Sequence, residues 1–311
     1  MNNKLNLSVS PHIHSGRSTS RIMLDVIIAL LPVTVAGTII FGLRSLLVIA
    51  TCIASCVALE ALFNIICKKD QTIGDLSAVV TGLLLALNLP ANIPLWQCVI
   101  GSAFAIVVVK ALFGGIGCNP VNPAITARVF MIISFGSLAI PAYPLSVDAS
   151  SSATPLESVY AGNTPELMDV FLGKTGGAIG ETCALALIIG FAYLLVRRVI
   201  SWHLPVAFVG TVYVLSFFME GLDPTKALVM ILSGGLLIGA IFMATDYVTS
   251  PSTVSGKLIF GIGAGLISFV IRYFGTYPEG VSFGILFMNI LTPYIDSWTK
   301  HKVFGVGGKK A

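Results

Sequence analysis

The chain has 311 residues, of which 56% are hydrophobic and only 10% are charged, and its mean hydropathy is +0.93. Soluble domains carry about 25% charged residues, so this composition excludes a soluble globular enzyme, a disordered chain and a disulfide scaffold. The net charge of +4 is spread between apolar blocks, which excludes a basic face for nucleic acid.

The apolar residues form about ten blocks along the chain. Crossing the hydrocarbon of a bilayer takes about 20 residues of helix. The blocks are continuously apolar rather than alternating, which favours helices over a barrel. We therefore expect an all-α integral membrane protein with about ten transmembrane helices, near residues 22–41, 45–67, 74–89, 93–113, 122–140, 178–196, 203–220, 226–244, 257–274 and 280–297.

The distribution of Lys and Arg predicts the orientation. If the N-terminus is cytoplasmic, only four of the 18 basic residues lie outside, namely Arg44, Lys174, Lys226 and Arg272. We therefore expect both termini in the cytoplasm. Lys110, near the inner end of the fourth block, is expected to snorkel to the interface.

Residues 141–177 form the only long connection, and this topology makes them an extracytoplasmic loop. The loop separates an N-terminal five-helix repeat, 1–140, from a C-terminal five-helix repeat, 178–311. An odd number of spans per half gives the halves opposite orientations, as in inverted-repeat transporters.

Each half contains a polar break that carries proline, at residues 114–124 and 243–253. Paired breaks of this kind indicate a central site, because their freed backbone groups need partners. Ordinary cytoplasmic loops explain them equally well. The side chains that could contribute to a site are Asn119, Asn122, Thr245 and Asp246.

Acidic residues within apolar blocks are the next candidates. Asp25 lies about one turn into the first block and Glu60 lies within the second. An intramembrane acid is a candidate for an ion path, although Asp25 is as readily an interfacial carboxylate near a helix N-terminus. The glycines at 261, 263 and 265 lie within an apolar helix, so they predict close helix packing rather than phosphate binding.

Several stretches together resemble the NqrB/RnfD family, which includes the D subunit of Rnf complexes and the B subunit of the sodium-pumping NADH:quinone reductase. They are Ser10-Pro11-His12, the run 20–32, the break 114–124 with its two Asn-Pro pairs, Ala244-Thr245-Asp246 with Thr249-Ser250-Pro251, and 278–289. The resemblance extends over essentially the whole chain, and the chain length is closer to the Rnf branch.

The resemblance implies a covalent flavin. In the family, FMN is attached to a threonine through a phosphoester bond, in a motif like D-x-x-[ST]-[GS]-A-T. Asp148 and Ser152-Ala153-Thr154 fit that motif, so Thr154 is the implied attachment site. Ser152 stands where glycine is common, and it is still small. Composition alone would make residues 148–157 a flexible Ser-rich loop.

The resemblance also implies the function: a membrane component of an ion-translocating ferredoxin:NAD oxidoreductase that couples electron transfer to Na⁺ or H⁺ movement. The implied partners are the A, B, C, E and G subunits of an Rnf complex and, for maturation, a flavin transferase. A noncovalent riboflavin occurs in some relatives, and no catalytic side chain or metal site is implied. The alternative, from topology alone, is a flavin-free inverted-repeat transporter or channel.

Overall fold

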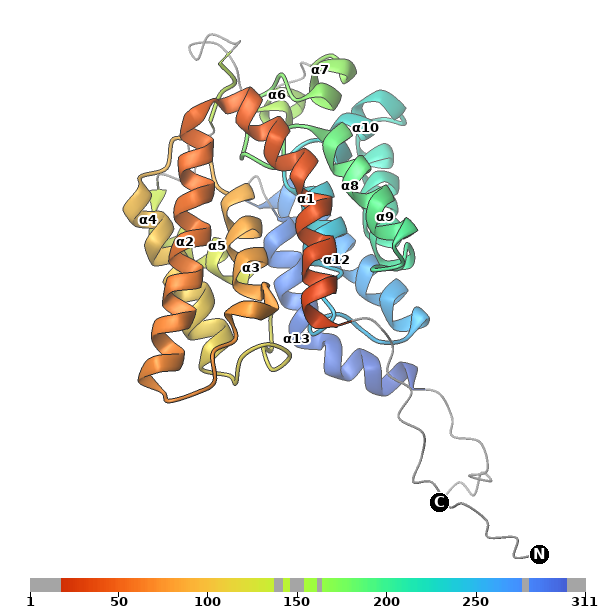
Figure 1. Cartoon of the computed structure of the whole chain (residues 1–311). Helices are drawn as coiled ribbons and strands as arrows, with labels where there is room; N and C mark the ends of the chain where they lie inside the picture. Colours follow the sequence, from red (N-terminus) through yellow and green to blue (C-terminus); the bar gives the residue numbers. More distant parts are fainter. Residues whose placement is uncertain (1–17, 137–141, 146–153, 161–163, 276–279, 301–311) are drawn as a thin grey trace, which may run out of the picture.

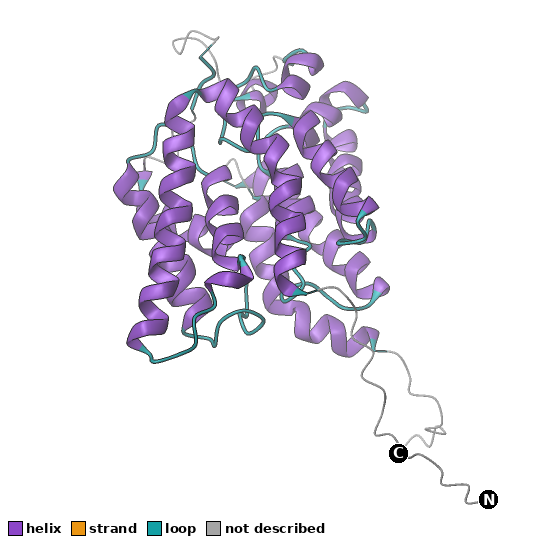
Figure 2. Cartoon of the chain, viewed as in Figure 1, coloured by secondary structure: helices purple, strands orange, loops and turns teal. Residues whose placement is uncertain are grey.

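The computed structural model describes residues 18–136, 142–145, 154–160, 164–275 and 280–300. The described chain is a bundle of helices (Figures 1 and 2). The principal helices are α1 Thr19–Phe41, α2 Leu43–Ile66, α3 Ser77–Leu87, α4 Leu95–Ala103, α5 Pro123–Ser134, α8 Ala184–Val196, α9 His203–Met219, α10 Pro224–Leu232, α12 Val254–Phe274 and α13 Val281–Thr299. Shorter elements are the 3₁₀ turn Ile73–Asp75, α6 Pro155–Tyr160, α7 Leu167–Leu172 and α11 Leu236–Ile238, with π-helical segments at Phe104–Ala111 and Gly239–Met243.

Polar residues in the connections begin several of these helices. The Asn122, Asp223 and Thr253 side chains accept hydrogen bonds from the first backbone N–H groups of α5, α10 and α12. Such caps satisfy donors that have no partner within the helix. The polar residues therefore fix where apolar helices start.

The described helices follow the predicted apolar blocks in order, but many are short. Three helices, α1, α2 and α12, are long and apolar enough to cross a membrane. A fourth crossing results if α10 and the α11 segment, bent by 65° at their break, form one span. The structure thus supports a multi-pass membrane protein, while the number of crossings stays a prediction.

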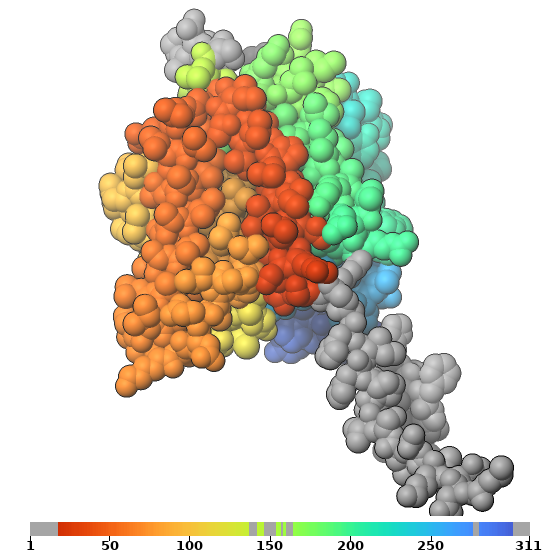
Figure 3. All heavy atoms as spheres, viewed as in Figure 1, coloured from red at the N-terminus to blue at the C-terminus, as the bar shows by residue number. Residues whose placement is uncertain are grey.

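Figure 1 places α6 and α7 at one end of the bundle and the start of α1 and the end of α13 at the other. Helices from the two halves pack together, α1 on α8 and α5 on α13. The space-filling view shows α1 running along the front face between α2 and α8 (Figure 3). The segment that includes Thr154 therefore lies opposite the described chain ends.

The glycines of α12 serve close packing, as predicted. A Cβ on Gly261 would lie 2.8 Å from the Leu204 carbonyl oxygen of α9, and one on Gly265 would lie 2.8 Å from the Thr211 Cβ. No larger residue fits at either position without moving α9. The α9–α12 contact is therefore a small-residue helix interface.

We expect Gly265→Leu to destabilise the protein by about 1–3 kcal/mol, because it overpacks this interface. Gly210→Leu is the matched control, since Gly210 lies on α9 with no atom within 4 Å of its would-be Cβ. Thermal unfolding in detergent measures both. Equal midpoints for the two variants would contradict the assigned contact.

Candidate functional site

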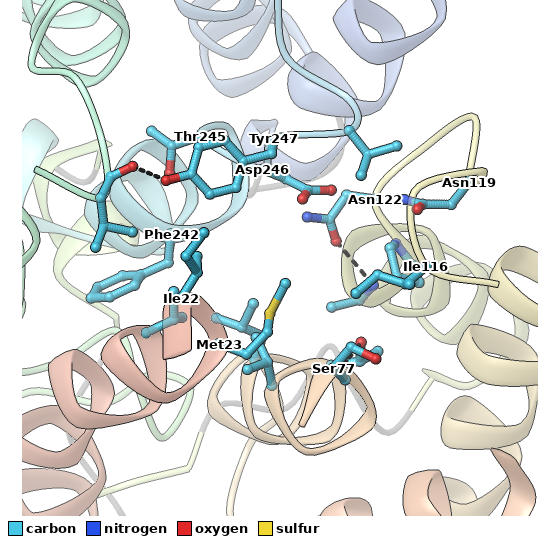
Figure 4. A pocket seen from close by; sticks show the side chains of 18 of the residues that line it. Ile22, Met23, Ser77, Ile116, Asn119, Asn122, Phe242, Thr245, Asp246 and Tyr247 are labelled. Atoms are coloured by element: carbon cyan, nitrogen blue, oxygen red, sulfur yellow. Dashed lines mark hydrogen bonds between the residues drawn. The ribbon is translucent and has the colours of Figure 1, made fainter. Parts of the chain in front are cut away.

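The two polar breaks meet in one pocket, which encloses about 100 Å³ at the end of the bundle where α1 begins. Figure 4 shows side chains of both breaks around it. Ile22, Met23 and Phe242 form an apolar wall. The polar lining consists of Ser77, Thr81, Lys110, Asn119, Asn122, Thr245, Asp246 and Tyr247.

Asn122 joins the two breaks. Its side-chain oxygen accepts hydrogen bonds from the Ala124 and Ile125 N–H groups at 3.0 and 3.3 Å, which caps α5. Its amide nitrogen donates to the Met243 carbonyl, 121 residues later, at 3.2 Å. The first break is thus tied to the end of the π-helical segment Gly239–Met243.

Asp246 is the only acid among the described residues that line the pocket. It accepts a hydrogen bond from the Thr249 hydroxyl at 3.2 Å and also interacts with the Asn119 side chain. Burial raises the pKa of the Asp246 carboxyl above its ordinary value of 3.8, against the lowering effect of these hydrogen bonds. A bound cation would therefore stabilise the ionised form of Asp246.

Helix α13 holds the second break in place. The Thr292 hydroxyl donates to the Thr249 carbonyl at 2.9 Å. The Asn289 amide, in the orientation that satisfies both of its ends, donates to the same carbonyl and accepts from the Asn122 N–H, each at 3.2 Å. Sequence reasoning missed this role of Asn289, although a buried asparagine within an apolar helix is itself a signal.

Lys110 does not snorkel to the interface as predicted. Its ammonium lies 2.7 Å from Glu60 and donates to the Ser77 hydroxyl at 2.5 Å, and both members of the ion pair are about 95% buried. Glu60 also accepts a hydrogen bond from the Thr72 hydroxyl at 2.6 Å. Glu60 is the buried partner that keeps the lysine inside.

Arg128 is buried within α5. It donates to Glu181 at 2.7 Å and to the Asn88 side chain. Glu181 precedes α8 and Asn88 follows α3, so this buried network links both halves of the chain. The sequence singles out neither Glu181 nor Asn88, because their partner is distant along the chain.

Asp25 lies on α1, beside the C-terminal end of α8 in the second half of the chain. Arg197 contacts its two carboxylate oxygens at 3.2 and 3.3 Å, and the Tyr193 hydroxyl donates to it at 3.0 Å. The Asp25 side chain is 13% exposed, whereas that of Arg197 is 56% exposed. The pair therefore lies at the surface of the bundle, outside the lining of the pocket.

Thr154 lies directly before α6, and its carbonyl accepts a hydrogen bond from the Ser158 N–H at 2.9 Å. Leu156 and Val159 of α6 pack with Val170 of α7 against Val229 and Met230 of α10. Asp148 to Ala153, the rest of the implied flavin motif, lie outside the described residues, as do Ser10 to His12. Thr154 therefore lies at the start of α6, a short helix that packs against α10.

These features define a helical membrane protein with buried ion pairs and a polar pocket at one end. The chain belongs to the NQR2, RnfD, RnfE family, whose sequence profile matches residues 6–305.

Three curated relatives are similar to this chain over nearly its full length and their own. The D subunit of the Na⁺-translocating ferredoxin:NAD⁺ oxidoreductase complex of Acetobacterium woodii is 47% identical, over 98% of this chain and 97% of the relative. Its counterpart in the proton-translocating ferredoxin:NAD⁺ oxidoreductase complex of Clostridium ljungdahlii is 39% identical, over 97% of each. The corresponding protein of the ion-translocating oxidoreductase complex of Vibrio atlanticus is 36% identical, over 96% of this chain and 99% of the relative.

We expect Asp246→Asn to change the pH dependence of stability. The folded protein holds the Asp246 proton more tightly than the unfolded chain does. The stability that proton binding adds is therefore fully present below pH 3.8 and is lost as the pH rises through the raised pKa of the folded state. The variant should therefore be more stable than wild type above that range and equal to it below. Thermal unfolding against pH measures this, and parallel curves would contradict the burial of the carboxyl.

Proposed function

We propose that this chain is the membrane subunit of an Rnf-type complex, which carries FMN on Thr154 and takes part in coupling electron transfer between ferredoxin and NAD to the movement of Na⁺ or H⁺. The observation that carries the proposal is its family membership together with full-length similarity to D subunits that are named for ion translocation. The electron-transfer chemistry would come from the flavin, while the protein sets its position and potential.

Thr154 suits a covalent attachment site. It is partly exposed and stands at the start of a short helix, which is anchored on α10 by Leu156 and Val159. Attachment through a phosphoester at its hydroxyl would leave the isoalloxazine ring free for redox chemistry. The docked helix would hold the attachment point at a defined place on the bundle.

The pocket suits a cation. Asp246 supplies a negative charge, while Asn119 and Thr245 supply neutral oxygens, the ligands that hard cations prefer. The Lys110 ammonium in the lining is already paired with Glu60. The carbonyl end of the Gly239–Met243 segment also lies here, with the polarity that favours cations. Its 100 Å³ holds a cation with about three waters, since each water occupies about 30 Å³.

For the topology, we propose ten spans in two inverted five-helix repeats, 1–140 and 178–311, with 141–177 outside and both termini in the cytoplasm. Pairing of the first helices of the halves, α1 and α8, and of the last, α5 and α13, supports this arrangement. The chain would then sit in the bacterial inner membrane with the A, B, C, E and G subunits, and a flavin transferase would modify it.

Asp25 is a second candidate for the ion path in this proposal. Its pair with Arg197 and Tyr193 supports an anchoring role for the carboxylate equally well. Unchanged Na⁺ or H⁺ coupling in an Asp25→Asn complex would remove it from the path.

The attachment site can be tested by fluorescence of the denatured chain in a gel, after expression with a flavin transferase. We expect a fluorescent band from wild type and none from Thr154→Val, because the acceptor hydroxyl is lost. Thr164→Val is the matched control and should keep the band, since Thr164 also precedes a proline in the same loop.

A dark wild-type band, with the transferase active on another substrate, would instead favour the flavin-free transporter. That alternative draws its support from the pocket between the two breaks alone.

A further inference from the structure

The broken helix α10–α11 reaches from the flavin-attachment segment to the pocket. At one end, Val229 and Met230 of α10 pack against α6 and α7. At the other, Phe242, Thr245 and Asp246 follow α11 and line the pocket. One continuous stretch, 224–246, therefore contacts both places that the proposed function needs.

The break at Ser233-Gly234-Gly235 divides this stretch into two bodies inclined at 65°. Gly234 has a φ of +65°, a left-handed conformation that glycine adopts without strain. The hydrogen bonds of α10 end at Ser233, whose N–H donates to Val229, and those of α11 begin with the Gly239 N–H donating to Gly235. The joint is thus a pair of glycines between two separately bonded helices.

Buried charged side chains lie against both sides of the joint. Arg272 of α12 donates to the Met230 and Ser233 carbonyls at 2.9 and 3.2 Å, which caps the end of α10. On the other side, a Cβ on Gly235 would lie 3.0 Å from both Arg128 and Glu181. The end of α10 is therefore held by Arg272, while the start of α11 lies against the Arg128–Glu181 pair.

We propose that this joint couples the flavin to the pocket, with Arg272 as a positioning residue; this inference rests on the proposed function. A change of flavin charge at Thr154 first acts on α6 and, through it, on α10. Helix α10 then turns at Gly234 against its contacts with Arg272. As a result, the Gly239–Met243 carbonyls and Asp246 shift at the pocket. Hinges that absorb a backbone change at a few residues are a common form of such coupling.

Coupling of this kind is reciprocal, so a bound cation must also change the flavin potential. The test is a redox titration of the covalent flavin in the whole complex, at several Na⁺ concentrations at fixed pH and at several pH values at fixed Na⁺. A Thr154→Val complex identifies the covalent flavin signal. We expect the wild-type midpoint potential to shift with one of the two ions.

Gly234→Ala should reduce the coupling factor calculated from that shift by about five-fold or more, because its Cβ would lie 3.1 Å from the Arg272 guanidinium at a left-handed backbone position. Gly221→Ala is the matched control and should keep the wild-type shift. Gly221 has a similar φ of +72°, but nothing lies within 4 Å of its would-be Cβ.

A full shift in Gly234→Ala, or no shift with either ion in wild type, would overturn the proposed coupling. If Gly234→Ala does not assemble, Arg272→Lys replaces it in the titration. Lysine keeps the charge and loses the two-pronged contact, so a wild-type shift in that variant would also overturn the proposal. A wild-type band without flavin fluorescence would show instead that the proposed function itself has failed.

Discussion

The requirement that buried backbone groups find partners inside the protein governs this structure. In a bilayer, non-helical backbone is tolerated only where protein or enclosed water satisfies it. At the end of α3 and just after it, the Leu87 and Leu89 carbonyls accept hydrogen bonds from the Gly180 and Ile179 N–H groups, at 2.7 and 3.1 Å. At the end of α10, the Arg272 guanidinium supplies the donors for the Met230 and Ser233 carbonyls. The interruptions of the helices are therefore where polar and charged side chains collect.

This requirement also explains why the two halves depend on each other. The Leu87 and Leu89 carbonyls in the first half receive donors from the segment before α8, and Arg128 reaches Glu181 in that segment. Asn122 likewise reaches the Met243 carbonyl. Removing one member of a buried ion pair typically costs about 3–5 kcal/mol of stability. These contacts therefore fix the position of one half on the other, and they also hold each polar break in place.

Sequence reasoning succeeds where one stretch carries the whole signal. The apolar runs of α1, α2 and α12 and the packing role of Gly261 and Gly265 are local properties, and the polar breaks are visible as interruptions. It fails where the partner is distant. Spacing alone puts Lys110 at the interface, because it cannot pair the lysine with Glu60, 50 residues away. Pairing of Glu181 with Arg128 is invisible for the same reason.

The proposed topology puts Thr154 and the pocket at opposite faces of the membrane, and labelling with an impermeant maleimide tests it directly. Cys67 and Cys118 are exposed natural cysteines in the connections near the pocket end, and Thr164→Cys would report on the flavin segment. In single-cysteine chains, Cys67 and Cys118 should react only in inside-out vesicles and Thr164→Cys only in right-side-out vesicles. Labelling of all three from the same side would contradict the account.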